Sequence, residues 1–198
     1  LGWLKQVIFE NGDMPLVNDS ANGIAPSATE LFRYAGRLGI KENGCPLKES
    51  GYRKVKKGDY EAFIDAGNIC PDYMTGHAHS DTFNFMLYLK CSPFIVDTGV
   101  STYENSALRL RQRGTSAHNT VQVGDYEQSE VWESFRVARR AHVTELSEDE
   151  NTISAAHDGY GRIGVLHKRA WQFSDNAVII TDEIISKRDY PCYAFFHF

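Results

Sequence analysis

Short runs of strand-forming residues fill the sequence from residue 51 onward and restrict what this chain can fold into. The runs are rich in Val, Ile, Phe, Tyr and Thr, and Gly, Asp and Asn separate them. They occupy residues 62–64, 83–89, 94–96, 119–123, 135–143, 152–156, 170–173 and 178–181. Runs of these residue types with turn formers between them are typical of antiparallel strands. Strands at such close spacing predict a β-sandwich or an open barrel.

The first 50 residues show a different pattern. Ser27 and Glu30 have the spacing of a capping box, and the apolar residues that follow recur at helical spacing until Gly39. Residues 9–16 contain an Asn-Gly turn and a proline, which indicates connecting structure. We therefore predict an all-β protein, an antiparallel β-sandwich with a short N-terminal helical segment.

Composition and charge exclude several classes of protein. With 42% apolar and 24% charged residues, the 198-residue chain can bury a core. The net charge of -5 gives no cationic excess, so we expect neither a nucleic acid nor a membrane as partner. No stretch has the length and apolarity of a membrane span, and the first residues lack the pattern of a signal peptide. The apolar run 193–198, with no turn after it, predicts that the domain is C-terminally truncated.

Three polar islands interrupt the apolar runs, at residues 76–81, 97–99 and 116–120. Imidazole nitrogen and carboxylate oxygen are preferred ligands of zinc. On a strand, His77 and His79 would point to one face, and the distance along the chain to Asp97 allows a strand, a turn and a return strand. The alternatives are a chance His-x-His pair, a simple turn at Asp97 and a hydrogen-bonded core histidine at His118.

A cupin-like metal enzyme would also place a His-x-His pair in a small β-barrel. Cupins have a glutamate a few residues after the second histidine, and residues 80–89 contain none. This absence weighs against the cupin interpretation.

Residues 76–121 closely resemble the C-terminal β-sandwich of the heparinase II/III-like polysaccharide lyases. The matching strings are GHAHSD at 76–81, VDTG at 96–99, STYE at 101–104 and RGTSAHNTV at 113–121. The resemblance extends through residues 51–53, 63–67, 128–132, 135–137 and 157–160. It implies that residues 1–50 are the tail of the family's helical toroid with a linker, and that residues 51–198 are the sandwich domain.

The same resemblance implies an activity and a site. Members of this family cleave uronate-containing acidic polysaccharide by β-elimination, which leaves an unsaturated sugar. His77 would be the catalytic histidine, and His79, Asp97 and His118 would hold a zinc ion of mainly structural role. The remaining catalytic groups would lie in the helical toroid, so we expect the toroid to be a partner and the chain alone to be inactive. The family also implies a periplasmic or secreted location.

Two residues near these motifs are candidates for contact with substrate. Tyr103 follows Asp97 along the same edge, and Arg113 precedes His118, where a guanidinium group would bind sugar carboxylates. A second basic group around Arg136 is interpreted as the solvated face of a strand. The competing function is a non-catalytic carbohydrate-binding or structural module that keeps the sandwich and its zinc.

Overall fold

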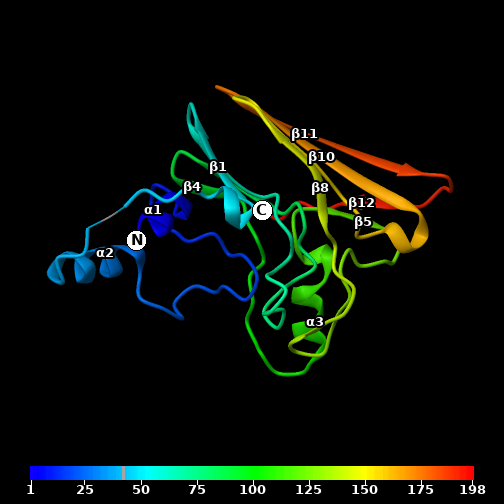
Figure 1. The fold of residues 1–198 in the computed structure, drawn as a ribbon, viewed down its shortest axis with the longest axis horizontal. Coiled ribbons are helices and arrows are strands. Elements are labelled where there is room, and N and C mark those ends of the chain that lie inside the picture. Colours follow the sequence, from blue (N-terminus) through cyan, green and yellow to red (C-terminus); the bar gives the residue numbers. More distant parts are fainter. Residues whose placement is uncertain (42) are drawn as a thin grey trace.

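Two four-stranded antiparallel sheets face each other in the computed structural model, which describes residues 1–41 and 43–198 (Figure 1). The first sheet has the order β1-β2-β3-β4, with bounds Tyr52–Lys57, Tyr60–Asp65, Phe85–Leu89 and Ser92–Ile95. The second has the order β11-β10-β9-β8, with bounds Ala177–Ser186, Val165–Ser174, Thr152–His157 and Val143–Glu148. This architecture confirms the predicted antiparallel β-sandwich.

The main core lies between the two sheets. Alternate residues of β2, Ala62 and Ile64 among them, point into it, and Trp171 and Phe173 of β10 meet them from the second sheet. Trp171 is fully buried, and its ring meets Phe83 edge-on at a centroid distance of 5.7 Å. The period-2 alternation of the strands thus supplies one apolar face from each sheet.

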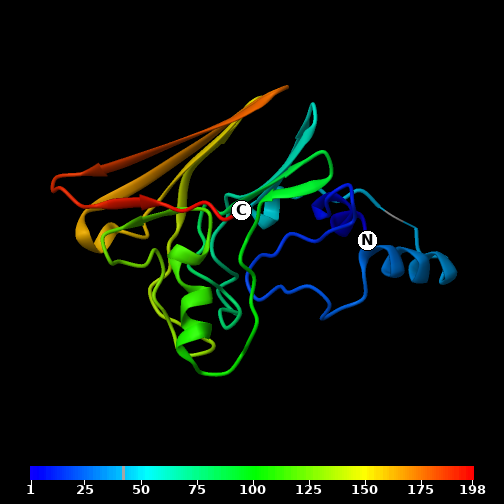
Figure 2. The same ribbon diagram turned by 180° about the vertical axis from the view of Figure 1, so that it is seen from behind.

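The N-terminal segment covers the outer face of the first sheet. It contains α1 (Gly2–Val7) and α2 (Ala28–Arg37). Val7 and Phe9 pack over Phe63 of β2, and the Phe9 ring stacks on Tyr88 with 3.7 Å between centroids. Strand β2 is therefore buried on both faces, which explains its continuous burial. Figure 2 shows α2 extending away from the sheets.

The predicted capping box at the start of α2 is present. The Ser27 side chain accepts a hydrogen bond from the Glu30 amide, and the Glu30 carboxylate accepts one from the Ser27 amide at 2.8 Å. Helix α1 and a third helix, α3 (Ala107–Arg113), were not predicted. None of the helices in the described ranges is long and apolar enough to span a bilayer.

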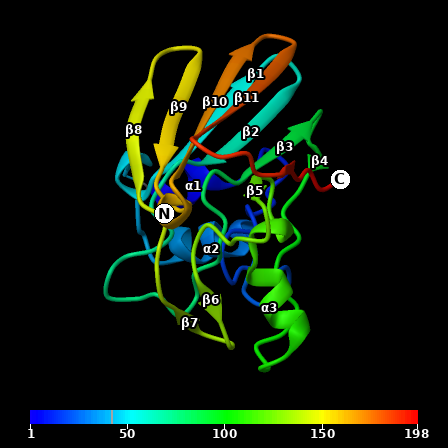
Figure 3. The ribbon, with the colours of Figure 1, turned by 90° about the vertical axis from the view of Figure 1, so that its right-hand side faces the viewer.

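Smaller elements gather at one end of the sandwich, where Figure 3 shows α3 beside β6 and β7. These elements are β5 (Val121–Val123) paired with β12 (Cys192–Ala194), β6 (Val131–Trp132) paired with β7 (Arg136–Val137), and the 3-10 turns Lys48–Ser50, Thr115–Ala117 and Gly161–Ile163. The prediction of one strand over residues 135–143 is wrong. Two residues of that run pair as β7, and the chain is irregular from there to β8.

A chain of buried polar groups crosses the second sheet. The Gly159 amide donates to His157 Nδ1 at 3.1 Å, His157 Nε2 lies 2.9 Å from His167 Nδ1, and His167 Nε2 lies 2.7 Å from Asp182 Oδ1. The Arg169 guanidinium pairs with both oxygens of Asp182, at 2.7 and 2.8 Å. Because the Gly159 amide can only donate, each imidazole must be neutral and donate along the chain toward the carboxylate.

Candidate functional site

The His-x-His pair lies in the irregular loop between β2 and β3, not on a strand. The two rings nevertheless converge on one carboxylate. His77 Nδ1 lies 2.7 Å from Asp19 Oδ2, and His79 Nε2 lies 2.9 Å from Asp19 Oδ1. His79 is fully buried, whereas the His77 side chain is 58% exposed. One histidine of the pair therefore faces solvent and the other faces the interior.

Asp19 belongs to the N-terminal segment and is itself buried. Both of its oxygens also accept hydrogen bonds from the Arg109 guanidinium, the one from Nη2 at 2.8 Å. Burial alone would raise the pKa of Asp19, but the hydrogen bonds from His79, Arg109 and His77 lower it strongly. The carboxylate is therefore ionised at neutral pH.

Asp97 and His118 meet on the other side of His79. Asp97 follows β4, and its Oδ2 lies 2.7 Å from His118 Nδ1. The same oxygen accepts a hydrogen bond from the Asn84 amide at 2.6 Å, and Asp97 Oδ1 accepts one from the Gly99 amide at 2.8 Å. Burial would raise the pKa of Asp97, but its bonds to His118 and Gly99 lower it. The return of the chain through β3 and β4 thus brings Asp97 to His118, whose ring lies next to that of His79.

Two imidazole nitrogens in this cluster have no hydrogen-bond partner. They are His79 Nδ1 and His118 Nε2, both buried, in rings whose centroids are 5.3 Å apart. Because His79 donates from Nε2 to Asp19 and His118 donates from Nδ1 to Asp97, the unpartnered nitrogen of each ring carries a lone pair whenever that imidazole is neutral. Burial lowers the pKa of His79 to about 4, which keeps its imidazole neutral. Two buried lone pairs that face no donor suit a zinc ion.

The ligand atoms of His79, Asp97 and His118 are less closely grouped than those of another set. Within residues 1–41 and 43–198, the group with all ligand atoms within 4.8 Å of one another is Glu10, Glu61 and Cys91. Lysine ammonium groups already pair with its carboxylates, Lys54 with Glu61 at 2.7 Å and Lys56 with Glu10 at 2.5 Å. That group is therefore an ion-pair cluster near the hairpin turns of the first sheet.

Arg113 is placed in the interior. Its side chain is fully buried, and it donates to the Ala78 carbonyl at 2.9 and 3.2 Å and to the Glu133 carbonyl at 3.1 Å. Burial and the neighbouring Arg109 lower the pKa of Arg113 to about 10. Because Ala78 is the residue between the two histidines, Arg113 holds their loop in place. This position gives the predicted contact with substrate no support.

Tyr103 lies at the surface beside His77. Tyr103 is 47% exposed and Phe135 is 42% exposed, and their ring centroids are 5.5 Å apart. His77 meets the Phe135 ring edge-on at 5.8 Å, and the Arg109 guanidinium lies 5.2 Å from the Tyr103 ring centroid and 5.4 Å from that of Phe135. The two rings form an exposed aromatic wall next to the exposed histidine.

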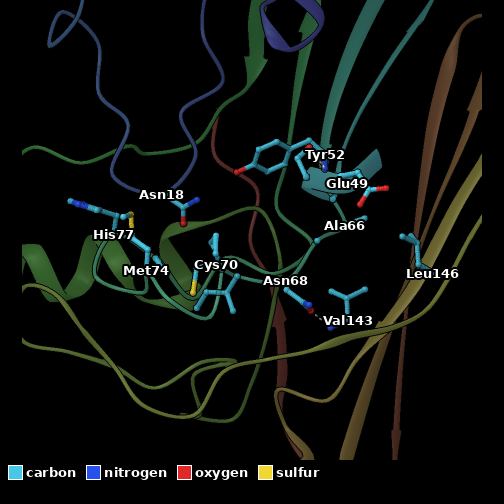
Figure 4. Close-up of a pocket in the computed structure, with 16 residues that line it drawn as sticks. Asn18, Glu49, Tyr52, Ala66, Asn68, Cys70, Met74, His77, Val143 and Leu146 are labelled. Carbon is cyan, nitrogen blue, oxygen red and sulfur yellow. Dashed lines mark hydrogen bonds between the residues drawn. The ribbon is translucent and has the colours of Figure 1, made fainter. Parts of the chain in front are cut away.

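A cavity of about 710 Å³ opens beside the histidine loop (Figure 4). His77, Asn18 and Met74 line one end, and Tyr52 points toward them from the first sheet (Figure 4). Burial raises the pKa of the Tyr52 hydroxyl well above its usual value, so the hydroxyl stays protonated. His77 thus contacts the aromatic wall and also lines a hollow with mixed polar and apolar residues.

Sequence reasoning missed Asp19 as part of the site and, with it, the pairing of Asp19 with the histidines and with Arg109. Asp19 is 58 residues from His77 along the chain, and Arg109 is 90 residues from Asp19. The available signal was the string Asn18-Asp19-Ser20, a polar cluster in an otherwise connecting segment.

Comparison with known proteins identifies the family. Residues 40–198 match the family model described as heparinase II/III-like, C-terminal. The chain belongs to the heparinase II/III-like family. This membership confirms the resemblance found in the sequence. No curated protein matches the chain.

Several solved structures share the fold of this heparinase II/III-like domain. One is titled heparan sulfate lyase HepC from Pedobacter heparinus, with a TM-score of 0.63 and 15% identity over 95% of this chain and 32% of that one. Another is titled Heparinase III, with a TM-score of 0.59 and 18% identity over 93% of this chain and 32% of that one. The chain therefore spans about a third of the length of these structures.

Proposed function

We propose that this chain is the C-terminal sandwich of a polysaccharide lyase that cleaves uronate-containing acidic polysaccharide by β-elimination. Membership of the heparinase II/III-like family supports the proposal, as does the shared fold with a structure titled heparan sulfate lyase. The observation that carries it is the exposed imidazole of His77, held at Nδ1 by a buried carboxylate.

The reaction requires a base for the proton next to the sugar carboxylate, a group that neutralises that carboxylate, and an acid for the leaving oxygen. His77 suits the transfer of a proton. Its Nδ1 is directed at Asp19, so its Nε2 is free to accept a proton from a bound sugar or to return one. The ring edge that faces Asp19 is fixed, which orients the exposed edge before substrate arrives.

Substrate would contact the surface around His77. The aromatic wall of Tyr103 and Phe135 offers exposed ring faces on which a sugar ring packs, and the hydroxyl of Tyr103 lies 3.4 Å from the Asp19 carbonyl. We retain Tyr103 as a substrate contact. Arg113 would affect this surface only indirectly, because its hydrogen bonds to the Ala78 carbonyl hold the histidine loop in place.

His79, Asp97 and His118 would hold zinc. When bound, the ion would supply a cross-link between three segments that are distant in the sequence. It would thereby make the loop that carries His77 more rigid. The fit rests on the two unpartnered imidazole nitrogens, while Asp97 already orients the His118 ring.

The remaining catalytic groups would come from a helical toroid domain in the full-length protein. We expect these to be a tyrosine that acts as acid or base and an Asn or His that neutralises the substrate carboxylate. The chain alone then has half of the site and should show no lyase activity.

The test is the formation of the unsaturated uronate, followed by ultraviolet absorbance on a panel of heparin-like, alginate-like and capsular polysaccharides. The full-length protein should be active on at least one of them, and His77→Ala should lower its rate by about 10² to 10⁴. The exposed His142, with a 57% exposed side chain, provides the control substitution His142→Ala, which should leave the rate unchanged.

Two outcomes would contradict the assignment. Wild-type rates in His77→Ala would remove His77 from the reaction. A full-length protein that binds acidic polysaccharide but never forms the double bond would instead be a non-catalytic binding module.

A further inference from the structure

We infer that Asp19 is a positioning residue that fixes the tautomers of His77 and His79 together. It leaves a lone pair of His77 at the surface and a lone pair of His79 in the interior. The catalytic consequence rests on the proposed lyase function, whereas the proton positions do not.

The argument starts from the hydrogen-bonding capacity of one carboxylate. An ionised carboxylate only accepts hydrogen bonds, so every nitrogen that contacts it must carry a proton. Asp19 Oδ2 lies 2.7 Å from His77 Nδ1, and Oδ1 lies 2.9 Å from His79 Nε2. A neutral imidazole has one N–H, so His77 is protonated at Nδ1 and His79 at Nε2. The two histidines are therefore opposite tautomers.

Arg109 keeps the carboxylate in the form that this arrangement needs. Its guanidinium donates to both oxygens of Asp19, and its Nε and Nη2 also donate to the Ser134 carbonyl at 3.1 and 2.9 Å. The guanidinium also lies beneath the rings of Tyr103 and Phe135. A fully buried cation fixed on this many sides holds Asp19 ionised and in a single orientation.

The opposite tautomers place one free nitrogen at the surface and the other in the interior. The free nitrogen of His77 is Nε2, on a side chain that is 58% exposed. The free nitrogen of His79 is Nδ1, which is buried without a partner beside the ring of His118. One carboxylate thus directs one histidine toward substrate and the other toward the predicted metal position.

The experiment measures proton positions by ¹⁵N NMR of the full-length protein with labelled histidine, at a pH where His77 is neutral. Signals are assigned by their loss in His77→Ala and His79→Ala. In the wild type we expect the proton of His77 on Nδ1 and that of His79 on Nε2. A wild-type His77 with its proton on Nε2 overturns the inference, and this measurement needs no Asp19 variant to fold.

The variant Asp19→Asn then tests cause and effect. Its side chain offers one accepting oxygen and one donating amide in place of two accepting oxygens, so at least one imidazole must reverse its tautomer. We expect the NMR pattern to change and kcat to fall by about 10² to 10⁴ with little change in KM, because Asp19 does not reach substrate. Asp13→Asn makes the same change at an exposed residue of the same segment and should alter neither quantity.

The outcomes separate this inference from the proposed function. A folded Asp19→Asn protein that keeps both tautomers and its kcat refutes the positioning role. A wild-type protein without lyase activity refutes the proposed function, and the NMR measurement still decides the role of Asp19.

Discussion

Acidification should unfold this protein through the two buried histidines of the second sheet. His157 and His167 donate in series toward Asp182, and each must be neutral to do so. Burial lowers the pKa of His157 well below its usual value, and burial together with Arg169 also lowers the pKa of His167. The unfolded chain takes up protons at both positions near pH 6.5, while the folded chain does not. Stability is therefore fully present above about pH 6.5 and is lost as the pH falls below it.

The size of the pH effect on stability follows from the number of protons that the chain takes up when it unfolds. Each histidine that stays neutral in the folded state but is protonated in the unfolded state lowers the free energy of unfolding by about 1.4 kcal/mol for each unit by which the pH falls. The pair together lowers it by up to about 2.7 kcal/mol per unit. The variant His157→Gln cannot titrate, and its amide can still donate to His167. It should cost about 1 to 3 kcal/mol at pH 8, because the bond from Gly159 is weakened. Its stability should then fall less steeply with acid, by about 1.4 kcal/mol per pH unit.

The assay is urea unfolding at several pH values between 8 and about 5, with a chelator present so that metal binding adds no pH dependence. His142→Gln, at an exposed position, is the matched control for losing one histidine. His118 has the opposite effect on the pH dependence of stability, because Asp97 raises its pKa although burial lowers it. His118 is present in the wild type and in both variants, so the comparison between them cancels its contribution. Equal slopes for wild type and His157→Gln would falsify the reasoning.

Three further predictions concern zinc, the histidine loop and the core. Elemental analysis of the purified protein should find one zinc per chain, lost in the double variant His79→Ala with His118→Ala; zinc at about 100 times its Kd should add about 2.7 kcal/mol to the free energy of unfolding, and retention of zinc by the double variant would contradict the assignment. Arg113→Met should destabilise the fold by about 1 to 3 kcal/mol in urea unfolding, because it leaves the Ala78 carbonyl buried without a donor. An unchanged free energy of unfolding would show that the loop does not depend on the hydrogen bonds from Arg113. Trp171→Ala should cost about 3 to 5 kcal/mol in the same assay, since it empties the centre of the main core, and a cost below 1 kcal/mol would place the core elsewhere.

Local patterns were sufficient to predict much of the fold. The capping box of Ser27 and Glu30 marks the start of α2 by chemistry within four adjacent residues. The strands at 152–157 and 177–186 contain the predicted runs, because β-branched residues between turns point to one structure. Helix α3 was missed because its arginines resemble a solvated turn, whereas the structure buries Arg109 and Arg113.

The site was predicted only where its residues share a motif or a hairpin. His77 and His79 are neighbours in one motif, and Asp97 returns through β3 and β4 to His118, next to His79. Asp19 could not be found in this way, because no periodicity links it to the loop and only tertiary packing brings it there. The interior position of Arg113 likewise depends on carbonyl groups that α3 meets after folding.

The packing of the N-terminal segment also limits where recombination can divide such proteins. The part of the chain that the family model matches begins at residue 40, yet Val7 and Phe9 cover one face of the first sheet and Asp19 holds two histidines of the loop. A recombination event at residue 40 would deliver a sandwich with a bare apolar face and an unsupported His-x-His pair. The unit that evolution can exchange intact is therefore larger than the unit that sequence similarity detects, and viable crossovers should fall upstream of Val7.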